Sequence, residues 1–370
     1  MHRSRRRLPA PVAASALALL TVLTAACGSG SDASGTSSPT SAPAGSPSSQ
    51  RGFDLEAHRG GAGLTVESTL AAFGRALDLG VTTLELDTQI TRDGHAVVSH
   101  DNTVDGEKCR DTAPLKPGDP SYPYVGKRVK TLDLAQLRTL DCGSRTLPSF
   151  PGQKAAPHAR IPLLSEVFAL VRTRSADTVR FNIETKIDSA KPEESAPREQ
   201  FVQVLAADIR RASLGARVSI ESFDWGSLMR MKQVSPALSL VALADRTSLE
   251  AGQPGASPWL GGLDIDDFGG DVVAAAHSFG AGAVSPVHGS PSGATVTDPS
   301  YRPYVNAAMV RRAHRLGMRV IPWTVDDEAT TTMGSLIDAG VDGMITNYPD
   351  RLRHVMAAKG LPLPTAYAAP

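Results

Sequence analysis

Four short motifs between residues 56 and 101 carry side chains whose types and spacing could do chemistry. They are Glu56-Ala57-His58-Arg59-Gly60-Gly61, Val66-Glu67-Ser68-Thr69, Leu84-Glu85-Leu86-Asp87 and Val98-Ser99-His100-Asp101. The motifs supply carboxylates that can hold a divalent cation, an arginine that can bind a phosphate, and two histidines that titrate near neutral pH. Their combination within one supersecondary unit predicts an enzyme site for metal-assisted attack on a phosphodiester.

The spacing inside two strand-like runs brings charged side chains to one place. Side chains alternate across a strand, so Glu85 and Asp87 share one face while the neighbouring leucines share the other. In a later run, the same parity groups Asn182, Glu184 and Lys186. If these strands belong to a barrel, their polar faces point inward near the C-terminal ends of the strands, where the active sites of barrel enzymes lie.

Glu85, Asp87 and Glu184 are the candidate metal ligands. Inward carboxylates are costly unless they pair with cations or bind a metal. One interpretation is a structural ion-pair network with Arg59 and Lys186, but the two histidines nearby favour metal ligation. Three oxygen donors suit a hard divalent cation, Ca2+ in the first place and Mg2+ as the alternative. A site rich in oxygen and poor in cysteine does not suggest structural zinc.

These motifs resemble the pattern of the glycerophosphodiester phosphodiesterase family, which runs His-Arg-Gly, Glu-Asn-Thr, Glu-x-Asp and His-Asp. Four later segments are similar to its remaining motifs: Asn182-Ile183-Glu184-Thr185-Lys186, Ser222-Phe223-Asp224, Trp323-Thr324-Val325 and Thr346-Asn347-Tyr348-Pro349. The resemblance extends from Phe53 to Arg353. One position departs from the pattern, because Ser68 stands where the family usually has Asn.

The resemblance implies that His58 and His100 are the general acid and base, without saying which is which. It also implies that Arg59 and Lys186 stabilise charge that develops on the phosphorus. The candidate substrate-binding residues are Arg59, Glu67, Ser222, Phe223, Trp323 and Asn347. Two of them have alternative roles. Glu67 could serve the dipole of a helix or orient a histidine or a glycerol hydroxyl, and Trp323 could fill the barrel core. The remaining histidines belong to no motif and are expected at the surface; they are His95, His158, His277, His288, His314 and His354.

The implied reaction is the hydrolysis of a small-molecule glycerophosphodiester to sn-glycerol 3-phosphate and an alcohol. The nucleophile stays open between water and a hydroxyl of the substrate. Two rival functions remain: a phospholipase D-like enzyme of the same superfamily that acts on lysophospholipid or sphingolipid, and a non-catalytic lipoprotein that binds phosphodiesters. The mostly polar composition of residues 102–161 argues against the first rival, and the pair of histidines argues against the second.

Short apolar runs alternate with helical patterns along the chain, which predicts an α/β fold, a (β/α)8 TIM barrel. The predicted strands are Asp54–Ala57, Thr83–Gln89, Val179–Lys186, Arg217–Ser222, Leu238–Leu243, Ala281–Pro286, Arg319–Thr324 and Gly343–Thr346. The predicted helices are Ser68–Asp78, Leu163–Arg174, Arg198–Ala212, Trp225–Gln233, Tyr304–Leu316 and Glu328–Asp338. We expect one catalytic domain over residues 52–358 and a tail at 359–370. Within the domain, residues 102–161 form a long insertion after the second strand, and long loops in compact domains are usually functional or disordered. The resemblance implies that this insertion covers the active site as a lid or a substrate-selecting wall.

The N-terminal segment predicts export. Residues 1–7 are basic and residues 8–26 are mostly apolar, which is typical of a signal peptide over residues 1–26. The alternatives are a Sec signal, which we favour, and a twin-arginine signal. Leu23-Thr24-Ala25-Ala26-Cys27 resembles a lipobox, and residues 27–51 have the composition of a disordered Ser/Gly/Pro tether. We therefore expect a lipoprotein anchored through Cys27 to the outer face of the membrane, or a secreted protein if cleavage occurs elsewhere.

The two remaining cysteines, Cys109 and Cys142, both lie in the insertion. In an exported protein they predict a disulfide, because a segment rich in Pro, Gly and charge is expected to have little core of its own. Two buried free thiols are the alternative. The chain balances 38 Lys and Arg against 38 Asp and Glu and has no long basic stripe, so a nucleic acid is not an expected partner.

Overall fold

The computed structural model of the protein describes residues 52–291 and 293–369. The predicted signal peptide, the tether and Cys27 lie outside the described residues. Within the described part of the chain, no helix is both long enough and apolar enough to cross a membrane.

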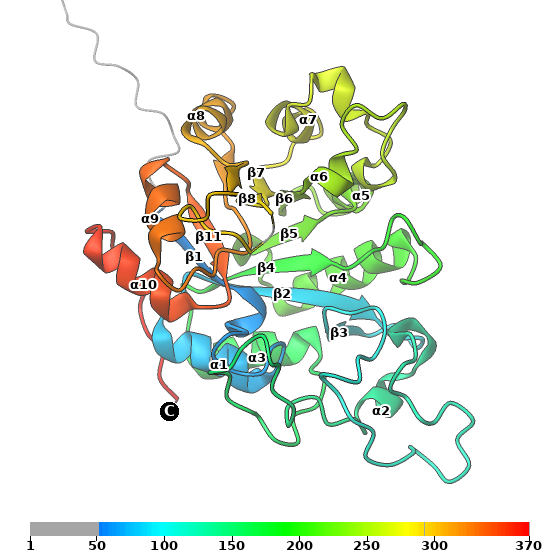
Figure 1. Ribbon diagram of the computed structural model, residues 1–370. Helices are drawn as coiled ribbons and strands as arrows, with labels where there is room; N and C mark the ends of the chain where they lie inside the picture. The colour runs from blue at the N-terminus through cyan, green and yellow to red at the C-terminus, as the bar shows by residue number, and fades with distance from the viewer. Residues whose placement is uncertain (1–51, 292, 370) are drawn as a thin grey trace, which may run out of the picture. The chain divides into compact units, whose positions relative to one another are not determined.

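The centre of the described chain is a sheet of eight parallel strands that curls into a barrel (Figure 1), as the sequence predicts. The neighbours follow the order β10-β7-β6-β5-β4-β2-β1-β11. The strands are β1 (Asp54–Ala57), β2 (Thr83–Ile90), β4 (Arg180–Thr185), β5 (Val218–Ser222), β6 (Ser239–Ala244), β7 (Ala283–Pro286), β10 (Arg319–Val320) and β11 (Gly343–Thr346). Backbone hydrogen bonds close the gap between the last two, from Asp342 N to Val320 O (2.9 Å) and from Ile345 N to Pro322 O (3.0 Å).

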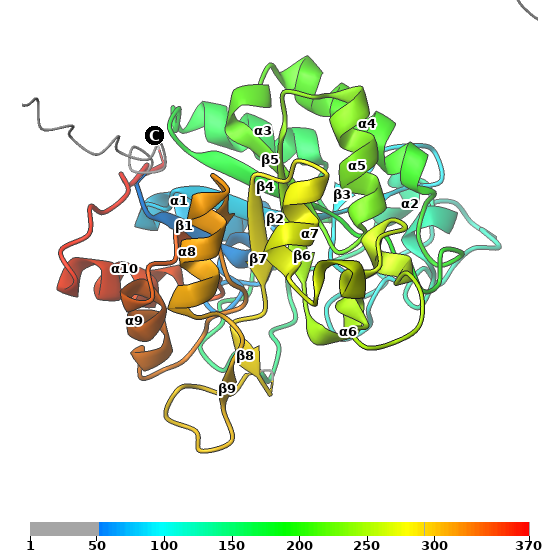
Figure 2. The same ribbon diagram turned by 90° about the horizontal axis from the view of Figure 1, so that it is seen from above.

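Helices lie around the strands on the outside of the barrel (Figure 2). They are α1 (Leu70–Leu79), α3 (Leu164–Thr173), α4 (Arg198–Ala212), α5 (Trp225–Val234), α7 (Val272–Ser278), α8 (Ala307–Arg315), α9 (Thr331–Asp338) and α10 (Pro349–Ala358), with the short α2 (Leu134–Leu137) and α6 (Arg246–Leu249). The main core lies between the two layers, where Leu84, Leu86, Phe181 and Ile183 are fully buried. Each such side chain contributes about 1.5–3 kcal/mol when it leaves water.

Several elements differ from the predicted ranges because the sequence pattern does not reveal where backbone geometry changes. Ser68 has a left-handed backbone (φ 58°), so α1 begins two residues later than predicted, with Thr69 as its N-cap. Asn306 caps α8 in the same way, and α8 and α9 both begin three residues late. The strand β10 ends at Val320, well before the predicted Thr324, because Pro322 has no N–H to donate to a ladder. Helices α7 and α10 were not predicted.

The insertion follows a short strand, β3 (Ala96–Val98), which pairs antiparallel with β2. Cys109 and Cys142 form the predicted disulfide, with their Cα atoms 4.0 Å apart. The expectation that the insertion has little core is wrong. It buries a separate apolar cluster around Tyr124, Leu132 and others, which the sequence hides because these residues are scattered singly among Pro, Gly and charged residues.

Two further segments complete the fold. A small antiparallel hairpin, β8 (Gly289–Ser290) and β9 (Arg302–Pro303), follows β7 and was not predicted. The predicted tail packs against the barrel's outer layer, where the backbone N–H of Tyr367 donates to Leu77 O (2.8 Å).

Candidate active site

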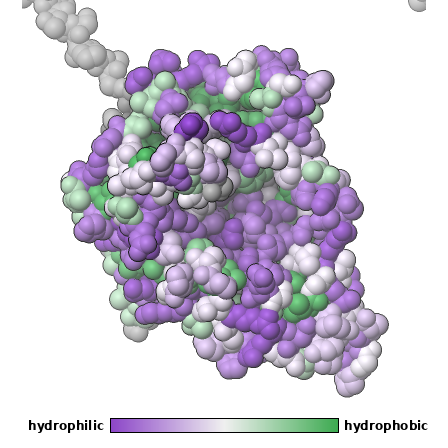
Figure 3. Space-filling view, viewed as in Figure 1, coloured by the Kyte–Doolittle hydropathy of each residue, from purple (hydrophilic) through white to green (hydrophobic). Residues whose placement is uncertain are grey.

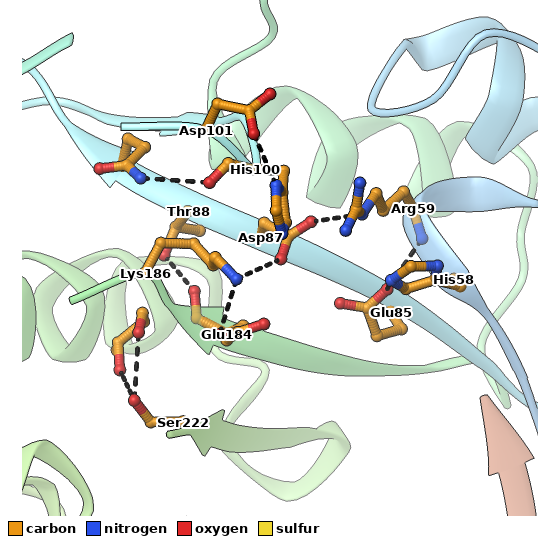
Figure 4. Close-up of polar contacts among 12 residues, drawn as sticks. His58, Arg59, Glu85, Asp87, Thr88, His100, Asp101, Glu184, Lys186 and Ser222 are labelled. Atoms are coloured by element: carbon orange, nitrogen blue, oxygen red, sulfur yellow. Dashed lines mark hydrogen bonds and ion pairs between the residues drawn. The ribbon is translucent and has the colours of Figure 1, made fainter. Parts of the chain in front are cut away.

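The three predicted metal ligands meet at the C-terminal ends of β2 and β4. Strand pairing places Asp87 directly opposite Glu184, and Glu85 precedes Asp87 on the same face. One ligand oxygen from each of Glu85, Asp87 and Glu184 lies within 4.8 Å of the others, and all three residues are buried. Figure 4 shows the three carboxylates with Arg59 and Lys186 on either side, Asp87 beside His100 and Glu85 beside His58. The strand parity read from the sequence therefore places these side chains correctly.

The acidic cluster carries more negative charge than its neighbours neutralise. Burial and the nearby Asp87 raise the pKa of Glu85 well above its ordinary value, and burial raises the pKa of Glu184 to about 7. Burial would also raise the pKa of Asp87, but Arg59, His100 and Lys186 outweigh it and lower the pKa. Neither carboxylate oxygen of Asp87 accepts a hydrogen bond from any described residue. Two buried oxygens that accept no hydrogen bond and meet only the cations of Arg59 and Lys186, within an all-oxygen cluster, fit a hard divalent cation.

Arg59 and Lys186 are the cations that face this cluster. Arg59 Nε lies 3.1 Å from Asp87 Oδ2, and Lys186 Nζ lies 3.0 Å from Glu184 Oε1 and 3.7 Å from Asp87 Oδ1. The ion-pair network considered as the alternative is thus present in the structure. It leaves the cluster with more carboxylates than cations, because two cations face three carboxylates.

The backbone around Arg59 is shaped for this role. Arg59 has a left-handed conformation (φ 52°), and its N–H donates to Glu85 Oε2 at 2.8 Å. The next residue, Gly60, also has positive φ, and a Cβ there would lie 2.9 Å from the backbone of α1. Only glycine fits both the conformation and the close approach.

His58 is held by a relay that runs to β11 and the segment before it. Asn347 Nδ2 donates to Asp326 Oδ2 at 2.6 Å, so the Asn347 Oδ1 atom faces the ring and accepts from His58 Nδ1 at 2.6 Å. This arrangement requires the Nδ1–H tautomer and leaves Nε2 free, 3.9 Å from Glu85 Oε2. Burial and the positive charge of Arg59 lower the pKa of His58 to about 3.

His100 is held by a second relay that runs into the insertion. Its Nδ1 donates to Asp101 Oδ1 at 2.8 Å. Lys108 Nζ lies 2.6 Å from Asp101 Oδ2 and 3.0 Å from Glu67 Oε1. Burial and Lys186 lower the pKa of His100. Both histidines therefore present only Nε2 for chemistry.

Glu67 occupies the space between the relay and Arg59. It accepts a hydrogen bond from Arg59 Nη1 at 3.1 Å and hydrogen-bonds to no histidine. Burial would raise its pKa, but Arg59 and Lys108 outweigh it, so the pKa is lowered and the charge is kept. The described contacts make Glu67 an orienter of Arg59, whereas the sequence had suggested a histidine or a glycerol hydroxyl as the group it orients.

A central cavity of about 80 Å³ joins these groups, and both histidines, Arg59, Glu85, Glu184 and Lys186 line it. Phe223 and Trp323 form part of its wall, with their rings edge to face at 5.4 Å. The face seen in Figure 3 is hollowed near its middle and hydrophilic within the hollow. The predicted wall role of Trp323 agrees with this position.

Ser222 does not line this cavity. It is fully buried, and its hydroxyl donates to Thr185 O (3.1 Å) and accepts from Thr185 Oγ1 (2.8 Å). Figure 4 shows it apart from the acidic cluster. Because its hydroxyl makes its hydrogen bonds within the protein, the geometry does not support the substrate-binding role.

One of the histidines expected at the surface is buried. His288 is only 4% exposed, and its ring stacks on Tyr301 at 5.8 Å. The hairpin of β8 and β9 brings Tyr301 there, and this hairpin was not predicted. His314 is half-buried beside Asp342 (2.9 Å), while the other four are exposed.

Sequence reasoning missed three residues of the site. Glu221 lines the central cavity and faces Glu184 across β4 and β5, which parity within Val218–Ser222 could have indicated. Asp326 and Lys108 come from loops, where no periodicity exists to place a side chain.

A parallel (β/α)8 barrel with paired histidines, two cations and an acidic triad at the C-terminal mouth defines a barrel hydrolase of phosphate esters. The model of the glycerophosphoryl diester phosphodiesterase family matches residues 58–351. A glycerophosphodiester phosphodiesterase from Caldanaerobacter subterraneus is 29% identical over 306 residues, which are 82% of this chain and 98% of the relative. The chain therefore belongs to the glycerophosphoryl diester phosphodiesterase family and is an enzyme of the phosphodiesterase class.

Solved structures agree with this assignment. A crystal structure of a protein from Silicibacter pomeroyi that carries the name of the same family is 26% identical in sequence to this chain. The two structures align with a TM-score of 0.67 over 84% of this chain and 95% of the other. A phosphodiesterase from Oleispira antarctica, in complex with the product sn-glycerol-3-phosphate, is 17% identical with a TM-score of 0.56, covering 82% of this chain and 96% of that one. The second likeness is one of fold.

Proposed function

We propose that this protein hydrolyses glycerophosphodiesters to sn-glycerol 3-phosphate and an alcohol, with a divalent cation and a pair of histidines. The observation that carries the proposal is the convergence of the acidic cluster, both histidines and both cations on one cavity. Family membership supports the reaction class, and the product bound to the Oleispira antarctica relative supports the identity of the phosphate product.

Glu85, Asp87 and Glu184 would hold the cation, Ca2+ before Mg2+. The all-oxygen donor set and the two unsatisfied oxygens of Asp87 support this assignment. When bound, the cation would polarise a phosphate oxygen and lower the pKa of a hydroxyl beside it. The carboxylates contribute by fixing its position.

The other side chains act on charge and protons. Arg59 and Lys186 stabilise the negative charge that develops on the phosphoryl oxygens. The free Nε2 atoms of His58 and His100 transfer protons, one from the nucleophile and one to the leaving alcohol. Asn347 and Asp101 hold the two rings in the tautomer that leaves Nε2 available.

The insertion, residues 102–161, would select substrates as a wall of the site. It places Lys108 against Asp101, beside His100. Asn102 lines a second cavity, of about 380 Å³, which adjoins the central cavity at His100, Glu184 and Lys186. The wall of that cavity carries charged residues, among them Lys186, Asp188 and Asp245, together with Phe223 and Trp259.

Turnover of glycerophosphocholine with and without chelator tests the proposal. We expect release of sn-glycerol 3-phosphate that stops on chelation and returns with Ca2+. Replacing Glu85, Asp87 or Glu184 by Ala should abolish activity while the fold survives by circular dichroism. Full activity in a metal-free sample would refute the metal assignment, and no release of sn-glycerol 3-phosphate would refute the reaction.

We also propose export and lipid attachment at Cys27, on the basis of the basic and apolar N-terminal segment and the lipobox-like residues before Cys27. Mass spectrometry of the membrane fraction should find a lipid on an N-terminal Cys27. A mature protein that begins at another residue and stays in the medium would contradict the anchor.

A further inference from the structure

Two larger cavities adjoin the central one, and they share no lining residue with each other. The first, about 380 Å³, shares His100, Glu184, Lys186 and Phe223 with the central cavity and is called here the Trp259 chamber. The second, about 420 Å³, shares Trp323 and Thr324 and is called the Asp327 chamber. A phosphodiester has two arms, so a phosphate in the central cavity can extend one arm into each chamber.

The Trp259 chamber holds carboxylates that no cation neutralises. Among its acidic residues, Asp101 pairs with Lys108 and Glu184 pairs with Lys186. Asp188 and Asp245 form no ion pair with any described residue and accept only backbone hydrogen bonds, from Ala190 and Lys191 and from Ser248. Both are half-buried, so their charges are screened less than charges on an open surface.

The same chamber has aromatic walls. The rings of Phe223 and Trp259 meet edge to face with centroids 6.4 Å apart, and both line the chamber. Aromatic faces beside uncompensated carboxylates are the arrangement that binds ammonium and quaternary ammonium groups. Asp188 and Asp245 would not attract an apolar or an anionic group.

The Asp327 chamber suits a different arm. Asp327 is 8% exposed, and its Oδ2 caps α9 by accepting from Thr332 N (2.8 Å). Its other oxygen, Oδ1, is buried without a hydrogen-bond partner among the described residues. The wall of this chamber also carries Thr324 and Asp326, and such an oxygen-rich wall suits hydroxyl donors; the glycerol arm carries two hydroxyls.

We propose that the Trp259 chamber selects substrates whose alcohol arm is cationic, of the choline or ethanolamine type, and that the Asp327 chamber receives the glycerol arm. This inference rests on the proposed phosphodiesterase function. The zwitterionic substrate would match the site at both charges, with its phosphate at Arg59 and Lys186 and its ammonium group at Asp188 and Asp245.

The test compares kcat/KM for glycerophosphocholine and for glycerophosphoglycerol, whose alcohol arm is uncharged. The wild type should prefer glycerophosphocholine, the substrate with the cationic arm, by about tenfold, the scale of one cation–π contact plus a carboxylate. Asp188→Asn, Asp245→Asn and Trp259→Leu should remove most of that preference by lowering the value for glycerophosphocholine alone. Asn keeps the backbone hydrogen bonds of the aspartates, and Trp259→Phe should restore part of the preference. Asp267→Asn, an exposed carboxylate outside the chambers, is the matched control.

Asp327→Asn should lower kcat/KM for both substrates alike, because both carry the glycerol arm. Calorimetric binding of choline to the wild type and to the Asp188→Asn, Asp245→Asn double variant requires no turnover. If the wild type binds choline and the double variant does not, the assignment of the Trp259 chamber is supported. If the same protein hydrolyses none of the substrates, the proposed function is overturned. Equal kcat/KM for both substrates, or variants that lower both values equally, would overturn the chamber assignment with hydrolysis intact.

Discussion

Each histidine of the site has a single ring nitrogen free for proton transfer. His58 Nδ1 donates to Asn347, and His100 Nδ1 donates to Asp101. The two relays differ in charge, because His58 faces a neutral amide and His100 faces a carboxylate. A carboxylate stabilises an imidazolium more than an amide does, so the pair can hold opposite protonation states.

We expect kcat/KM to show a bell-shaped dependence on pH, and either His→Ala change to lower kcat by about a hundredfold to ten-thousandfold, with little change in substrate affinity. A p-nitrophenyl leaving group needs little protonation. It should therefore rescue the variant that lacks the acid and leave the variant that lacks the base inactive, which assigns the two roles. Near wild-type kcat on glycerophosphocholine for both variants would mean that the histidines are structural.

At the scale of elements, the alternation of side chains along a strand explains why the sequence predicts the positions of the inward carboxylates correctly. Leu84 and Leu86 point to the helices, so Glu85 and Asp87 must point into the barrel, and no tertiary information is needed. Loops have no such period. Asp326 and Lys108 were therefore missed, and Ser222 was placed on the substrate by resemblance although its hydroxyl faces Thr185.

The insertion also couples to the site through one residue. Lys108 bridges Asp101 and Glu67, which hold His100 and Arg59 respectively, and it immediately precedes the disulfide at Cys109. The disulfide thus fixes the segment that carries the bridge.

We expect Lys108→Met to lower kcat about tenfold, since contacting charged groups typically couple by ~0.5–3 kcal/mol, and Lys108→Arg to retain most activity. If Lys108 acts through Asp101, adding Lys108→Met to Asp101→Asn should cost little more than Asp101→Asn alone. Lys116→Met, on an exposed part of the insertion, is the control. Additive losses, or a melting temperature that falls in parallel with kcat, would indicate a merely structural lysine.

At the scale of the whole barrel, polar groups fill successive levels of the interior. Asp54 pairs with Arg180 (2.5 Å) and Arg319 (3.0 Å) at the N-terminal end. Above it, Asn182 donates to Glu56 (2.9 Å) and to Glu221 (2.6 Å), and the acidic cluster lies at the mouth. The alternation of runs predicts the barrel. It cannot predict this pairing across the interior, because the partners come from strands far apart in the sequence.

Glu56 lies in the interior between the Asp54 ion pairs and the acidic cluster. Its ionisation should make the free energy of unfolding depend on pH. Burial and the neighbouring Asp54 raise its pKa from 4.5 to about 8 in the folded protein. Between those two values the folded state keeps a proton that the unfolded state has released. The stabilisation is thus fully present below pH 4.5 and is lost as the pH rises through about 8.

Glu56→Gln removes the ionisable group while its side-chain oxygen can still accept from Asn182. At pH 5 the variant and the wild type should melt at similar temperatures. At pH 8 the variant should be more stable, by on the order of 2 kcal/mol, since each unit of pKa shift is worth about 1.4 kcal/mol and part of it is lost to relaxation of the site. Thermal unfolding across this range, with Glu193→Gln as an exposed control, is the measurement. If the melting temperatures of the wild type and of Glu56→Gln change in parallel with pH, Glu56 is ionised in the folded barrel. The arginines paired with Asp54 would then also neutralise Glu56.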